Sequence, residues 1–174
     1  MMNTTIIIIL FLLLPAIVIG LFKIIEVRKK RLVRSNLQRT IDELVKNNGL
    51  LISETEFFSD KVISIDKRNR KLLFAHFRKQ GVKALCLDLR SISFCRVTKA
   101  MARFTGEVTE IFLQVKYADT DQLFRLHFYD RAKDDFRTEE ALLEKARLWK
   151  DKINLYRRPA NFKVVIDGST LFPA

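Results

Sequence analysis

The sequence predicts an α+β protein in which helical segments flank a run of antiparallel strands. Three observations lead to this class. The chain begins with an uncharged apolar segment of helical length, and its middle alternates apolar and polar residues with the period of strands. Residues after 138 then return to the period of an amphipathic helix. Strands followed by one such helix are typical of a helix that covers an antiparallel sheet.

The apolar segment is expected to be a transmembrane helix over residues 6–25, after a short outside N-terminus at residues 1–5. From Ile6 to Phe22 the chain holds 17 residues without a charge. A helix from Thr4 to Ile25 would be ~33 Å long, enough to cross a hydrocarbon core of ~30 Å.

A cleaved signal peptide and a buried core helix are the two alternatives to this anchor. A signal peptide has a positive first region, an apolar core of about 7–15 residues and a cleavage site of the Ala-x-Ala kind. Residues 1–5 contain no lysine or arginine, the apolar run is longer than that range, and a basic run follows it. A core helix that is apolar all round would need a larger protein around it.

The basic run after the apolar segment predicts the orientation of the chain. Positive residues next to a span remain on the cytoplasmic side, so we expect a single-pass protein of the cell membrane with its N-terminus outside and its remaining residues cytoplasmic. Six cations of this run are expected to contact the anionic membrane surface: Lys23, Arg28, Lys29, Lys30, Arg31 and Arg34.

Residues 26–49 are expected to form a basic helical stalk. Leu37, Ile41 and Leu44 recur with the spacing of one helix face, and Gly49 is placed for a left-handed C-cap. The stalk is either a connector that docks on the following domain or a helix that lies on the membrane or associates with a second copy.

The remaining residues predict one domain at 50–157 and a tail or short extra strand at 158–174. Alternation and turn signals indicate strands at 61–66, 71–77, 82–87, 92–98, 108–117 and 123–129. Thr138 is placed to N-cap a helix over 139–156, whose apolar stripe includes Leu142, Ala146 and Trp149.

This order of elements resembles small bacterial membrane-anchored proteins with a pleckstrin-homology-like (PH-like) domain. The matching parts are the hairpins 61–77 and 108–129, the strand junction 88–92 and the helix 139–156. The resemblance implies a partly open barrel that one C-terminal helix plugs. It also implies lipid-headgroup contacts at a basic cluster in the first hairpin loop, where Lys67, Arg68, Arg70 and Lys71 lie. An open antiparallel sheet with one helix on its face is the alternative fold.

The composition of the chain indicates which classes of partner it can bind. The net charge of +12 and the isoelectric point of about 10.0 favour an anionic partner. The densest basic run adjoins the apolar segment and no nucleic-acid-binding motif accompanies it, so we expect the membrane and a protein partner, and no nucleic acid.

Cys86 and Cys95 fit small buried residues in a reducing compartment. No nucleophile, P-loop or metal motif is present, so no cofactor and no metal are expected.

The sequence therefore favours a non-enzymatic, membrane-anchored cytoplasmic adaptor or scaffold that binds a protein partner at the membrane. The first alternative is a membrane protein that binds anionic lipid headgroups. The second is an unrecognised enzyme, which a pocket that holds His76 or His127 beside a carboxylate would support.

Overall fold

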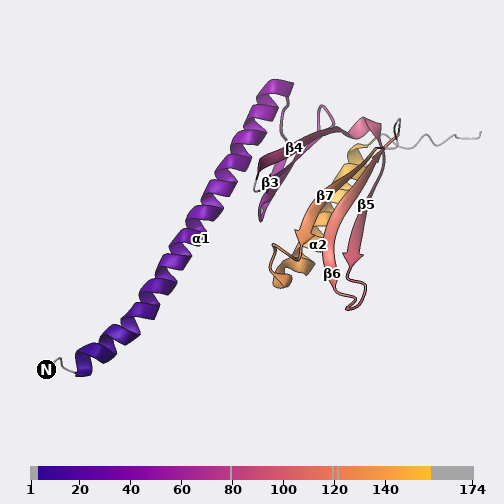
Figure 1. The fold of residues 1–174 in the computed structure, drawn as a ribbon. Coiled ribbons are helices and arrows are strands. Elements are labelled where there is room, and N and C mark those ends of the chain that lie inside the picture. Colours follow the sequence, from indigo (N-terminus) through magenta and orange to yellow (C-terminus); the bar gives the residue numbers. More distant parts are fainter. Residues whose placement is uncertain (1–3, 79, 119, 121, 158–174) are drawn as a thin grey trace, which may run out of the picture. The chain divides into compact units, whose positions relative to one another are not determined.

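The computed structural model describes residues 4–78, 80–118, 120 and 122–157, with side chains from residue 18 onward. The chain is α+β, with two antiparallel sheets and a C-terminal helix, as predicted (Figure 1). It divides into two compact units. The first unit comprises Met1–Asn69 and Leu73–Cys86, and the second comprises Arg70–Leu72 and Leu87–Ala174. The predicted tail or extra strand at 158–174 lies outside the described residues.

The N-terminal helix α1 runs without interruption from Thr4 to Asn48. Among the residues that the structure describes, no helix is long and apolar enough to cross a membrane. Most of the apolar run on which a span over residues 6–25 was expected precedes residue 18, so its side chains lie outside the described part. Gly49 has a φ of 59°, and the Leu50 amide donates to the Val45 carbonyl at 3.0 Å. The predicted left-handed cap is therefore confirmed.

The first sheet has four strands in the order β1-β2-β3-β4, which is also their order in the chain. The strands are β1 (Glu54–Phe58), β2 (Lys61–Asp66), β3 (Lys71–Arg78) and β4 (Gly81–Asp88). In the antiparallel pair of β1 and β2, Glu56 lies opposite Ile63. The last three strands were predicted to within one residue, whereas β1 was missed because Glu54-Thr-Glu-Phe-Phe58 lacks apolar alternation.

The C-terminal third of α1 packs in the core of the first unit. Leu37 and Ile41, one helical turn apart, are buried with Leu50 and with side chains of β2 and β3. The other buried members of this cluster are Val62, Leu73 and Ala75. For residues 33–45, this packing agrees with the interpretation of the stalk as a docked connector.

The second unit combines a three-stranded sheet of order β5-β6-β7 with the C-terminal helix α2. Its elements are β5 (Ile92–Met101), β6 (Val108–Tyr117), β7 (Leu123–Asp130) and α2 (Glu139–Tyr156), with short 3₁₀ turns η1 (Leu89–Ser91) and η2 (Phe136–Thr138). The helix contacts all three strands, and its predicted stripe residues Leu142, Ala146 and Trp149 are buried, as is Ile153. The stripe therefore places α2 on the sheet, as the sequence predicted.

Two local predictions were wrong in detail. Thr138 precedes α2, but its side chain makes no capping hydrogen bond. Its hydroxyl instead donates to the Asp135 carbonyl at 2.6 Å, because Thr138 closes the preceding 3₁₀ turn. Cys86 is exposed, because β4 is exposed or only half-buried from Gly81 to Cys86, whereas Cys95 is buried as expected. Burial raises the pKa of the Cys95 thiol to about 12.

Candidate functional site

Residues 18–32 of α1 expose large apolar side chains around the circumference of the helix. Successive helical residues are rotated by about 100°, so neighbouring exposed positions cannot share one face. Eight large apolar residues of this segment are exposed: Val18, Ile19, Leu21, Phe22, Ile24, Ile25, Val27 and Leu32. These side chains therefore do not form the single apolar stripe with which an amphipathic helix packs on a protein core.

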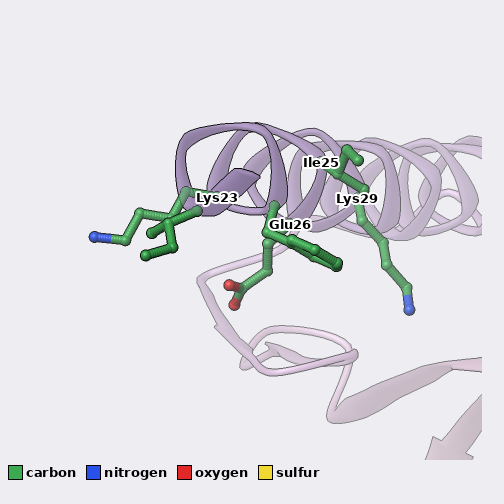
Figure 2. Close-up of a pocket in the computed structure, with 6 residues that line it drawn as sticks. Lys23, Ile25, Glu26 and Lys29 are labelled. Atoms are coloured by element: carbon green, nitrogen blue, oxygen red, sulfur yellow. The ribbon is translucent and has the colours of Figure 1, made fainter. Parts of the chain in front are cut away.

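An open hollow lies on this segment. Figure 2 shows that the Lys23 and Lys29 amines point away from each other, with the Glu26 carboxylate between them. Six residues line the hollow: Ile19, Phe22, Lys23, Ile25, Glu26 and Lys29. Because all of them belong to α1, the hollow is a feature of the helix surface, where apolar side chains meet the first charges of the basic run.

The six cations predicted to contact a membrane surface are all exposed on α1. Lys30 forms an exposed ion pair of 2.6 Å with Glu26, one turn earlier. Arg34 has a second role, since its guanidinium carbon lies 5.0 Å from the centre of the Phe57 ring on β1. This cation–π contact ties the end of the basic run to the first sheet.

The basic turn between β2 and β3 differs from its prediction in two ways. Because β1 precedes β2, this turn closes the second hairpin of the sheet and not the first, so it does not match the loop that the resemblance implied. In the first unit, Lys67 lies 3.8 Å from the Glu54 carboxylate. In the second unit, the Lys71 amine lies 2.8 Å from the Asp88 carboxylate. Arg68 and Arg70 are exposed.

A buried ionic cluster in the first unit joins His76 to a carboxylate, which sequence reasoning missed. The His76 Nε2 atom lies 2.9 Å from Asp60 Oδ2, and the Lys61 amine lies 2.6 Å from Asp60 Oδ1. His76 is 6% exposed and Lys61 is 0% exposed. Asp60 lies in the tight turn between β1 and β2, so only the unpredicted strand β1 explains its position.

The cluster is held by charge and hydrogen bonds together. Burial by itself raises the pKa of Asp60, but hydrogen bonds from His76 and Lys61 outweigh burial and hold this pKa well below its ordinary value. An ionised carboxylate only accepts hydrogen bonds, so Nε2 of His76 carries the proton. Arg78 Nε donates to the other ring nitrogen at 3.5 Å.

This geometry is that of a structural cluster. A general base must come within hydrogen-bond reach of a substrate proton. Both ring nitrogens of His76 face protein groups and the ring is buried, so in this arrangement the pair with Asp60 holds the β1–β2 turn to β3. His127 is half-buried, and its Nδ1 atom lies 3.8 Å from the Glu110 carboxylate, beyond hydrogen-bond distance.

Neither metal-binding groups among the described residues nor similarity to known proteins assigns a function to this chain. Within the described part of the chain, no group of three or more histidine, cysteine, aspartate or glutamate side chains is placed to hold a metal ion. Compared with protein-family models, curated proteins and solved structures, the chain gave no match.

Proposed function

We propose that this protein is a non-enzymatic, single-pass membrane-anchored adaptor or scaffold whose α+β part binds a protein partner at the cytoplasmic face of the cell membrane. The observation that carries the proposal is α1 over residues 18–32, where exposed apolar side chains surround the helix and meet the exposed cations of the basic run. Water solvates such an apolar surface poorly, whereas lipid chains cover it on every side.

The charge asymmetry supports the orientation. Between residues 23 and 39 seven cations are opposed by one acid, Glu26, and residues 1–5 carry no basic side chain. Cations next to a span are retained on the cytoplasmic side. The continuous helix through Asn48 and its docking at Leu37 and Ile41 would then keep the first unit close to the membrane surface.

The fold supports a binding role. The described strands and the C-terminal helix that follows them support the element order on which the resemblance to PH-like domains rests. The strand β4 is an end strand of the first sheet, and its residues Lys83 and Ala84 are exposed. End strands can pair with an extended segment of a partner through main-chain hydrogen bonds.

Site-specific photo-crosslinking in native membranes tests both parts of this proposal. We expect the full chain to remain with membranes after alkaline extraction, and a crosslinker at Ala84 to capture a discrete protein. The matched control is a crosslinker at Ala141, which is exposed on α2. Release of the protein at alkaline pH would refute the anchor, and equal capture from both positions would refute strand addition at β4.

Headgroup binding is the alternative that a specific observation favours, because Arg68 and Arg70 are exposed on the turn between β2 and β3. Replacement of Lys67, Arg68, Arg70 and Lys71 by glutamine should then lower binding to anionic vesicles. The pairing of Lys67 with Glu54 and of Lys71 with Asp88 opposes this alternative, because each lysine would have to leave a carboxylate. Unchanged binding of the quadruple variant would exclude it.

A further inference from the structure

The loop between β5 and β6 displays an aromatic side chain with no protein cover. We call residues 99–107 the hairpin tip. Phe104 at its end is 100% exposed, and Met101 at its start is 62% exposed. A fully exposed phenylalanine leaves its whole apolar surface in water, and burial of such a surface is favourable. The hairpin tip therefore has a surface that gains from an apolar partner.

Hydrogen bonds hold the backbone of the hairpin tip in a defined loop. The Ala102 amide donates to the Glu107 carbonyl at 2.9 Å, and the Gly106 amide donates to the Ala102 carbonyl at 3.1 Å. Gly106 has a φ of 67°, a conformation that glycine adopts without strain. The Arg131 guanidinium also pairs with the Glu107 carboxylate at 2.7 Å. Phe104 is thus presented by an ordered structure, which lowers the entropy cost of binding.

The charge on the hairpin tip is positive where Phe104 and Met101 are exposed. Lys99 and Arg103 are exposed beside them. The one carboxylate of this loop, Glu107, is paired with Arg131. Aromatic side chains next to cations are typical of segments that enter the headgroup region of anionic membranes.

The size of this surface favours a bilayer over a protein. A stable protein interface covers about 800 Å² on each partner, and two side chains on a projecting loop offer a small part of that area. A bilayer accepts single side chains at any point of its surface, so it imposes no such minimum.

We propose that the hairpin tip is a membrane-contact site, at which Phe104 and Met101 insert among the headgroups of an anionic bilayer and Lys99 and Arg103 contact lipid phosphates. The proposal rests on the proposed function in one respect, namely which membrane the hairpin tip reaches. Insertion itself requires an anionic bilayer within reach of the second unit.

Quenching of tryptophan by brominated lipid tests the contact in the full chain. The variant Phe104→Trp changes a fully exposed side chain, and the natural Trp149 is buried and supplies the background. We expect bromolipid vesicles of mixed phosphatidylcholine and phosphatidylglycerol to quench Trp emission of this variant beyond the wild-type background. At about 1 kcal/mol for each cation, the further changes Lys99→Gln and Arg103→Gln should lower the ratio of inserted to free tip roughly thirtyfold.

A matched control lies at the other end of the same unit. Leu155 is exposed near the end of α2, where the Arg157 guanidinium donates to the Ser93 carbonyl at 2.6 Å. Ser93 and Met101 are separated by eight residues of β5, about 26 Å. Leu155→Trp should therefore remain unquenched. Figure 1 shows the β5–β6 loop and the end of α2 at opposite ends of this unit.

Three outcomes overturn the proposal. Quenching of Phe104→Trp no greater than that of Leu155→Trp excludes insertion. Quenching that is equal in vesicles of phosphatidylcholine alone excludes the role of the cations. Protection of the new tryptophan from an aqueous quencher without quenching by bromolipid means that protein covers the tip. A separate Phe22→Trp variant reports the α1 anchor, so failure of the anchor and failure of the tip give different results.

Discussion

The two units of this protein bury different kinds of side chain. Among the described residues, every buried polar or charged side chain belongs to the first unit: Lys61, Ser64, Asp66 and His76. The buried side chains described in the second unit are apolar or aromatic, with Trp149, Phe128 and Tyr129 among the largest. The first unit therefore depends on satisfied polar groups as well as on packing, whereas the second depends chiefly on packing.

The turns of the first unit explain how it tolerates buried charge. The Asp66 carboxylate accepts the Leu51 amide at 2.7 Å and the Asn69 amide at 2.8 Å. Burial raises the pKa of Asp66, but these hydrogen bonds outweigh burial and lower it overall. A buried carboxylate with enough donors is stable in its ionised form. The comparison thus predicts that removal of a buried charge weakens the first unit more than removal of a surface charge weakens the second.

The largest effect is expected from Trp149→Ala in the second unit. Trp149 is fully buried on α2, so its removal leaves a large cavity and should lower the free energy of unfolding by about 3–5 kcal/mol. Native-state hydrogen exchange of β6 measures this loss. The adjacent Leu148→Ala removes an exposed side chain and should change stability by less than about 0.5 kcal/mol. Equal losses in the two variants would show that α2 does not pack through Trp149.

The next largest effect is expected from Leu37→Ala, which tests packing in the first unit. Leu37 is buried between α1 and the first sheet, so the substitution should cost about 2–4 kcal/mol. Hydrogen exchange of β2 and β3 peptides reports it. Leu32→Ala, on the same helix but exposed, is the control. If both variants exchange like the wild type, the C-terminal part of α1 does not dock on this sheet.

A smaller effect of about 2 kcal/mol is expected from Asp60→Asn, which removes the charge that pairs Lys61 and His76. Exchange in β2 and β3 should increase while that in β6 stays unchanged. The control Glu107→Gln removes a half-exposed ion pair in the second unit and should leave the free energy of unfolding nearly unchanged, because solvent screens such a pair. A larger loss from Glu107→Gln than from Asp60→Asn would reverse the comparison.

The smallest effect is expected from acid, which should weaken the first unit only at low pH. Because the pKa of Asp60 is lower in the folded chain than in the unfolded chain, its ionised form stabilises the fold above the unfolded pKa of about 3.9. This contribution is lost as pH falls below about 4 towards the folded pKa. Exchange in β2 and β3, corrected for the intrinsic exchange rate, should rise over this range. Asp60→Asn should show a shallower rise, and an identical slope would exclude the carboxylate.

Sequence reasoning located elements best where one face repeats. The helix α2 and the strands β2, β6 and β7 follow periodic apolar patterns, and their observed bounds lie within one residue of those predicted. It failed for β1, since Glu54 and Glu56 hide the strand pattern. It also failed for Asp60 and His76, because hydropathy assigns both residues to the surface, and a contact across 16 residues has no local signal.

The sequence by itself determined the α+β class, the helical start of the chain, the basic run and the apolar stripe of α2, because each follows from local period or composition. The tertiary structure decided which of these features is covered. It buried Leu37 and Ile41 of α1 but left Phe22 exposed, and it left Phe104 exposed at a hairpin tip. Exposure depends on which distant segments pack together, and that pairing is not encoded in any local pattern of residues.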